Sequence, residues 1–160
     1  MTVFRNLLII SALLVSALAY GQRTYRSGSV LASGNWFKIS VQEEGVYKID
    51  VPFLNSLGIS GNIPTSQVRI FGNGGAMLPE SCSEKPLDDL EENAIMAVDG
   101  GDGTLNGQDY LLFYAPGPHR WVKDSLNRKF SHQKNIYSDQ SFYFISVGGS
   151  RSVSSSRLLS

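Results

Sequence analysis

The stretch Trp36–Ile49, WFKISVQEEGVYKI, carries the clearest structural signal in the sequence. In its first half, Phe37, Ile39 and Val41 alternate with Trp, Lys and Ser, as side chains do on a strand with one buried face. A Glu-Glu-Gly turn then leads into a second alternating run, Val46–Ile49. Two such runs joined by a short turn that contains glycine predict a β-hairpin.

Four further runs have the composition of short strands, and Gly, Pro, Asn or Asp residues bound each of them. They are Val68–Phe71, Ala94–Val98, Tyr110–Tyr114 and Phe142–Val147. One short helix is predicted between Asp50, which can cap its first turn, and Gly58, which can end it. The apolar residues on one face of that helix are Phe53, Leu54 and Leu57. The pattern predicts a mainly β fold, an antiparallel β-sandwich or barrel-like domain with one short helix.

Residues 1–21 have the pattern of a signal peptide. Arg5 precedes Leu7–Ala19, thirteen apolar or small residues without a charge, a run shorter than the ~20 residues of a membrane-spanning helix. Cleavage before Gln22 leaves a β-domain at residues 22–147, followed by a Ser-rich linker or truncated end at residues 148–160. Because a linker normally leads to another domain, we expect an exported fragment or a natural truncation of a longer protein.

The composition argues against several classes of function. The chain contains 14 Lys and Arg residues and 14 Asp and Glu residues, so its formal net charge is zero. It therefore has no overall positive field to bind a nucleic acid. A single Cys excludes an internal disulfide and a multi-Cys zinc site. Charge is instead divided along the chain: Glu80–Asp109 holds nine acidic residues and one Lys, and Pro118–Tyr137 holds five basic residues and one Asp. Such blocks are either solvated loops or opposed docking surfaces.

Aromatic side chains crowd the second half of the chain. They are Tyr110, Phe113, Tyr114, Trp121, Phe130, Tyr137, Phe142, Tyr143 and Phe144. We expect them to pack in the core, with a contribution to an interface; the alternative is a sugar-stacking platform, which no spacing rule supports.

The sequence predicts no catalytic residue. Cys82 has acidic neighbours, which disfavour the reactive thiolate, and only His119 and His132 are present to pair with it. A serine nucleophile is not predicted either, because the chain lacks a Gly-x-Ser-x-Gly elbow. We therefore expect Cys82 to be an unpaired loop thiol.

The glycine-rich run Phe71–Gly75, FGNGG, has a superficial likeness to a phosphate-binding loop. A helix-forming segment and a Lys-Ser/Thr ending do not follow it, so nucleotide binding is not predicted. The glycines instead predict a tight reversal that needs positive φ angles.

The turn Asp99–Asp109, DGGDGTLNGQD, is the one candidate metal site. Its oxygen-bearing side chains could converge on calcium, and they belong to Asp99, Asp102, Asn106 and Asp109. The spacing departs from the EF-hand pattern, since aligning Gly103 with the invariant glycine leaves Val98 and Gly100 where carboxylates are required. The alternative is a turn between strands in which Asp and Asn bond to their own backbone. Beyond calcium, no cofactor is predicted.

Six segments give the chain a family resemblance. They are Gly34–Ile39, Glu44–Ile49, Val68–Gly75, Asp88–Ile95, Gly107–Pro118 and Phe130–Asp139. Together, and in this order, they resemble the N-terminal region of the PorU-type sortases of the type IX secretion system, which are gingipain-like cysteine peptidases. The resemblance extends from about Ser29 to Val147.

The resemblance implies an exported protein of the outer-membrane surface. Sortases of this family remove the C-terminal signal from secreted cargo and attach cargo to anionic lipopolysaccharide, and they act with an outer-membrane barrel partner of the PorV type. Their catalytic Cys and His belong to a peptidase domain C-terminal to this region, and neither Cys82 nor His132 matches them. The resemblance thus implies a non-catalytic N-terminal portion, with the missing peptidase domain, the barrel partner and cargo as partners.

A function of another class stays open from the sequence. The chain could be a free-standing exported β-module that binds a glycan, calcium or a protein partner. The two hypotheses differ in what they predict downstream, since the first requires a gingipain-like domain encoded after residue 160 and the second requires none. Neither predicts that the 160-residue chain is an enzyme by itself.

Overall fold

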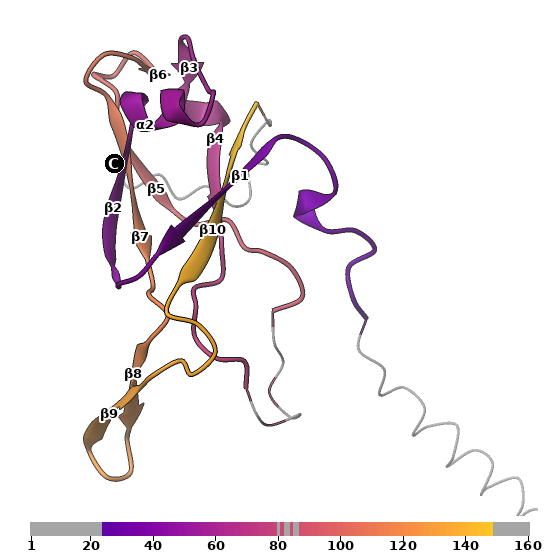
Figure 1. Cartoon of the computed structure of the whole chain (residues 1–160), viewed down its shortest axis with the longest axis vertical. Coiled ribbons are helices and arrows are strands. Elements are labelled where there is room, and N and C mark those ends of the chain that lie inside the picture. The colour runs from indigo at the N-terminus through magenta and orange to yellow at the C-terminus, as the bar shows by residue number, and fades with distance from the viewer. Residues whose placement is uncertain (1–23, 80, 82–83, 85–86, 149–160) are drawn as a thin grey trace, which may run out of the picture.

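The computed structural model describes residues 24–79, 81, 84 and 87–148, and its secondary structure is mainly β with one short α-helix (Figure 1). The predicted signal peptide, the thiol of Cys82 and the Ser-rich stretch beyond Gly148 lie outside the described residues. Within the described ranges, no helix is long and apolar enough to cross a membrane. The predicted mainly β, antiparallel architecture with one short helix is confirmed, and the described strands do not close into a barrel.

Two three-stranded antiparallel sheets form two layers (Figure 1). The first sheet, in the order β1-β10-β4, consists of β1 (Trp36–Val41), β10 (Ser141–Val147) and β4 (Val68–Phe71). The second, in the order β2-β7-β5, consists of β2 (Gly45–Asp50), β7 (Tyr110–Ala115) and β5 (Ile95–Val98). The strands predicted from sequence at these places are confirmed to within one residue at each end.

The predicted hairpin of Trp36–Ile49 is wrong. β1 pairs with β10 and β2 pairs with β7, so the Glu43–Gly45 turn carries the chain from one sheet to the other. A short turn between two alternating runs is compatible with either arrangement, because both bury the same side chains. Only the partners, which lie about a hundred residues further along the chain for β1, decide between a hairpin and a crossing between layers.

The core lies between the two layers. Cross-strand partners share a face of a sheet, and the registers line up apolar rows on the inner faces. The rows are Phe37, Ile145 and Ile70 in the first sheet and Tyr47, Phe113 and Ile95 in the second. Phe113 meets Tyr143 across the interior, with ring centroids 5.4 Å apart in an edge-on arrangement. The two sheets therefore share one hydrophobic core.

The helix α2 (Val51–Ser56) forms where its capping residues predict it. Oδ1 of Asp50 accepts a hydrogen bond from the Phe53 amide at 3.0 Å, and this bond lowers the pKa of the Asp50 carboxyl. Gly58 follows the last turn with a φ of 84°. Leu54 is fully buried, but Phe53 is exposed, because a helix of six residues at one end of the core covers it with a single side.

Smaller elements close the same end of the core. β3 (Ile63–Pro64) pairs with β6 (Thr104–Leu105), and both Ile63 and Leu105 are buried. The remaining elements are the 3-10 turns η2 (Val30–Ala32) and η3 (Thr65–Gln67). α2, β3 and β6 lie together at one end of the two layers (Figure 1).

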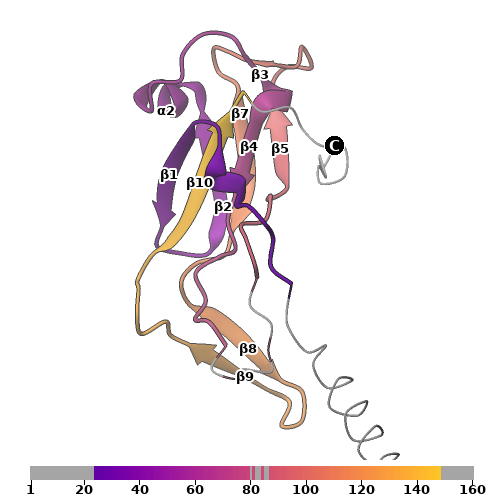
Figure 2. The same cartoon turned by 90° about the vertical axis from the view of Figure 1, so that its right-hand side faces the viewer.

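A hairpin that the sequence pattern did not predict projects from the opposite end (Figure 2). It consists of β8 (Arg120–Asp124) and β9 (Lys129–Gln133), and we call residues 120–133 the arm. The arm lies between β7 of the second sheet and β10 of the first, so it is an extended connection between the layers. The pattern gave no signal because neither face of the hairpin is buried.

The predicted tight reversal at Phe71–Gly75 is also wrong. A segment returns beside β4, where the Gly72 amide donates to the Glu91 carbonyl and Phe71 bridges Glu92. Within this run only Gly74 has a positive φ, of 76°. Gly72 is required for space instead, since a Cβ built on it would lie 2.4 Å from Cδ1 of Tyr143.

Replacing Gly72 by Ala should lower the free energy of unfolding by about 2 kcal/mol, because the fully buried Tyr143 ring has no free space to move into. Gly45→Ala is the matched control, since its Cβ would make an ordinary contact of 3.9 Å with Tyr47. Urea denaturation of both variants measures the difference. Equal stability of the two variants would contradict the packing argument.

Candidate interaction surface

The arm has two faces of different chemistry. Cross-strand partners share a face, so the pairs Trp121 with His132 and Lys123 with Phe130 lie on one side, which we call the aromatic-cationic face. The ring centroids of Trp121 and His132 are 5.0 Å apart. The opposite face carries Arg120, Val122, Asp124, Lys129, Ser131 and Gln133.

The large apolar side chains of the arm are open to solvent. Trp121 is 66% exposed, Phe130 is 68% exposed and Leu126 in the turn is 96% exposed. A two-stranded hairpin is marginally stable alone, and aromatic side chains of this size are enriched in protein interfaces. The aromatic-cationic face therefore has the properties of a docking surface for a protein.

The base of the arm is fixed to the two-layer body. Buried Asn135 donates from Nδ2 to the Gly75 carbonyl at 2.5 Å, and its own backbone amide donates to Nδ1 of His119 at 3.0 Å. Pro118 is fully buried, and a Cβ on Gly75 would lie 2.9 Å from its Cα. These contacts fix the direction in which the arm leaves the body.

A small pocket lies where the arm meets the turn between β1 and β2. Its volume is about 190 Å³, and its walls are Gln42, Glu43, Glu44, Gly117, Pro118, His119, Trp121 and His132. The ring of His132 joins the pocket to the aromatic-cationic face, and it also packs against His119 with centroids 5.8 Å apart. We call this space the acidic pocket because two adjacent glutamates form one of its walls.

The glutamates of the acidic pocket are held in place before any ligand arrives. A Cβ on Gly117 would lie 2.7 Å from the Glu44 amide nitrogen and 2.9 Å from the Glu43 carbonyl carbon, so turn and arm base are in close contact. The Glu44 carboxylate also accepts a hydrogen bond from the Tyr114 hydroxyl, which raises the pKa of Tyr114. The backbone contact fixes the turn, and the hydrogen bond fixes the Glu44 carboxylate.

The acidic pocket has the chemistry of a receptor for a cation. Among the described residues, neither Glu43 nor Glu44 forms a salt bridge with a Lys or Arg. Glu43, Glu44 and Trp121 line the same space, and carboxylates and indole rings both attract ammonium or guanidinium groups, through charge and cation-π interaction. Because ligand pockets usually measure about 300–1,000 Å³, this space suits a single long side chain rather than a cofactor.

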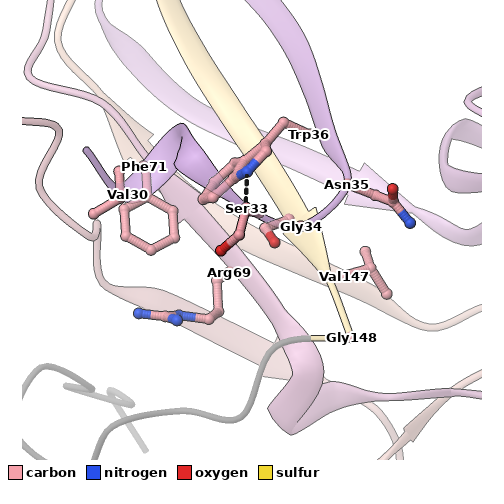
Figure 3. Close-up of a pocket in the computed structure, with 10 residues that line it drawn as sticks. Val30, Ser33, Gly34, Asn35, Trp36, Arg69, Phe71, Val147 and Gly148 are labelled. Carbon is pink, nitrogen blue, oxygen red and sulfur yellow. Dashed lines mark hydrogen bonds between the residues drawn. The ribbon is translucent and has the colours of Figure 1, made fainter. Parts of the chain in front are cut away.

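A larger groove of about 510 Å³ lies on the outer face of the first sheet (Figure 3). Trp36, Ser146 and Arg69 form its floor, since they are cross-strand partners in one row. Phe71 stands beside Trp36, with ring centroids 5.2 Å apart. The indole nitrogen of Trp36 donates to the Ser33 carbonyl at 2.7 Å, so its hydrogen-bonding capacity is already used (Figure 3).

The arginine of this groove is committed to the body of the domain. Nη2 of Arg69 donates to Oε2 of Glu92 at 2.8 Å, and its guanidinium carbon lies 4.7 Å from the centre of the Phe71 ring. The Arg69 side chain is 21% exposed and that of Glu92 is 4% exposed. The pair therefore ties β4 to the returning segment rather than offering a free charge to a ligand.

The four residues of the proposed calcium turn are placed in hydrogen-bonded turns. Asp99 accepts from the Thr65 hydroxyl and from the Gly101 amide, and these two bonds lower its pKa. Asp102 accepts from the Thr104 amide, and Asp109 accepts from the Asn106 amide. In the described part of the chain, no three His, Cys, Asp or Glu residues are grouped as metal ligands. These contacts do not test calcium binding, and they are of the kind expected for the alternative, a turn in which Asp and Asn bond to the backbone.

Sequence reasoning found part of the candidate surface. The basic block and the aromatic residues of the second half pointed to the arm, but their division between two faces follows only from the register of β8 and β9. Glu43 and Glu44 were interpreted as a turn alone, and no local signal connects them with Trp121, about eighty residues further along the chain. The structure brings His119 and His132 together at the base of the arm. Cys82, for which the sequence analysis considered them as partners, lies outside the described residues.

Comparison with known proteins identifies a relative of solved structure. No protein-family model matches it, and no curated protein is similar enough to match. The crystal structure of dimeric latent PorU from Porphyromonas gingivalis matches with a TM-score of 0.56 and 35% sequence identity over 74% of this chain. The chain is homologous to a part of PorU. It covers 10% of that PorU chain, a small region of a type IX sortase.

Arg69→Met should lower the free energy of unfolding by about 3 kcal/mol, because it removes a positive charge from the nearly buried Glu92 carboxylate. Lys48→Met breaks the exposed Lys48–Asp50 pair, whose side chains are 53% and 35% exposed, and should cost less than about 1 kcal/mol. Chemical denaturation compares the two variants. Similar losses would mean that the Arg69 pair is not a structural link.

Millimolar calcium should leave the thermal unfolding midpoint unchanged, because the Asp99, Asp102 and Asp109 carboxylates already accept backbone hydrogen bonds. The comparison is unfolding with calcium against unfolding with a chelator. A rise in the midpoint with calcium that Asp102→Asn abolishes would instead establish the cation site.

Proposed function

We propose that this chain is a non-catalytic docking module of a PorU-type sortase of the type IX secretion system, exported to the outer-membrane surface. The observation that supports the proposal is 35% identity to a region of PorU over 74% of the chain. In this proposal the peptidase chemistry, which cuts the C-terminal signal from cargo and joins cargo to anionic lipopolysaccharide, belongs to another part of the sortase.

The arm is the docking surface of the module in this proposal. Its aromatic-cationic face exposes Trp121 and Phe130 on adjacent strands, and exposed aromatic residues supply most of the binding energy in many interfaces. The candidate partners are the peptidase domain of the sortase, a barrel partner of the PorV type and cargo. PorU in the matching structure is a dimer, which adds a second sortase chain to these candidates.

A glycan-binding function has one structural observation in its favour. The groove of about 510 Å³ places Trp36 and Arg69 in one row, and an aromatic ring beside a polar side chain suits a sugar. Because the Trp36 nitrogen and the Arg69 guanidinium are already bonded within the domain, docking through the arm is the better supported function.

The full chain, carrying an affinity tag, should capture a PorU-type sortase, a barrel partner of the PorV type or secreted cargo from solubilised outer membranes of a bacterium that has this secretion system. Replacing Trp121 and Phe130 together by Ala should reduce the capture at least tenfold, or about 1.4 kcal/mol, as the loss of interface aromatics predicts. The control replaces exposed Val46 and Met96, on the outer face of the second sheet, by Ala. No capture by the unaltered chain, or equal capture by both variants, would reject the proposal.

A further inference from the structure

We propose that residues 24–33, which we call the strap, open and close beside the groove on the outer face of the first sheet, and that the Asp89 carboxylate is the latch that keeps the strap closed. Val30 and Ser33 of the strap line the groove next to Trp36, so the groove widens when the strap lifts (Figure 3). The inference goes beyond docking through the arm, since neither the strap nor the groove contains a residue of the arm.

The strap is attached by hydrogen bonds rather than by apolar packing. Within the strap only Val30 is partly buried, and the other residues are exposed. The turn η2 inside the strap contains no buried residue. By contrast, α2 is held to the core by the fully buried Leu54 side chain. The strap can therefore lift without leaving a cavity in the core, which makes it a segment that opens locally while the sheets stay folded.

One carboxylate makes most of the bonds to the strap. The Asp89 side chain is 9% exposed, and Nη1 of Arg26 lies 3.9 Å from its Oδ2. Oδ1 accepts from the Ser29 hydroxyl at 2.9 Å, and Oδ2 accepts from the Val30 amide at 2.7 Å. Oδ1 also accepts from the Leu90 amide at 2.9 Å. Asp89 thus joins three residues of the strap to the segment that returns beside β4.

The latch depends on the ionised form of Asp89. Hydrogen bonds from the Leu90 and Val30 amides hold the pKa of this carboxyl below its usual range. The charged groups beside it are Arg26 and the neighbouring Asp88, which accepts from the Arg26 amide at 2.6 Å. Because folding lowers the pKa, the contribution of Asp89 is fully present at neutral pH and is lost only as the pH falls through the lowered value. At neutral pH the strap is therefore closed, and a partner that binds the groove has to displace it.

The strap turns at Gly34, where it joins β1. Gly34 has a φ of 93°, a conformation that other residues rarely adopt. Just before this hinge, the Ser33 carbonyl accepts from the indole nitrogen of Trp36 at 2.7 Å. Within η2, the Ala32 amide donates to the Ser29 carbonyl at 3.0 Å. Neither of these two bonds includes Asp89, so both report movement of the whole strap rather than the loss of one contact.

Asp89→Asn tests the latch, because the amide keeps the shape of the side chain but removes its charge and turns an NH2 group toward hydrogen-bond donors of the strap or of Leu90. Hydrogen exchange of the full chain, followed by NMR, is the measurement. The Ala32 amide and the Trp36 indole proton should exchange at least tenfold faster than in the parent chain. The amides of β1, β10 and β4 should keep their protection.

Glu91→Gln is the matched control, since it removes the same charge from an exposed side chain two residues away and should leave all these exchange rates unchanged. Faster exchange at Val30 alone would overturn the proposal, because Asp89 would then be a local contact. Equal acceleration in the strap and the sheet strands would also overturn it, as would equal effects of the two variants. The arm takes no part in this measurement, so its outcome leaves the docking function of the arm to the capture experiment.

Discussion

The contact between Tyr143 and Phe113 is the constraint on which the rest of the structure depends. Tyr143 is fully buried in β10 of the first sheet, and its ring meets Phe113 of the second sheet edge-on. Burial raises the pKa of Tyr143 to about 12, and its hydroxyl donates to the Pro116 carbonyl at 2.8 Å. One side chain thus joins the layers and fixes the start of the arm, and it leaves no room for a Cβ at Gly72.

The body and the arm differ in whether their side chains contact the rest of the domain or solvent. In the body, apolar rows face one another, and polar groups such as Arg69 and Glu92 are bonded within the domain. In the arm, both strands expose their side chains, and the carboxylates at its base lack salt bridges among the described residues. The polar groups of the body are thus bonded within the domain, whereas the arm presents its side chains to solvent.

The chain that has this arrangement is homologous to a small region of PorU. Sequence reasoning reached that family because six segments occur in the family's order, and these segments include β1, β4 and β7 together with turns that hold Gly72 and Gly117. Both glycines lie against other parts of the chain at distances that a Cβ would not permit. Two of the six segments therefore contain a glycine that a close contact with another part of the chain requires.

By itself, the sequence determined the strands of the two sheets, the capped helix after Asp50 and the resemblance to a region of PorU, because these depend on alternation, on a capping side chain and on local turns. Only the tertiary structure decided that β1 and β2 lie in different sheets and that Glu43 and Glu44 adjoin Trp121. Strand partners and the two walls of a pocket are fixed by which distant surfaces bury one another. A local pattern of side chains contains no information about that choice, since the same alternation serves a hairpin and a crossing between layers equally well.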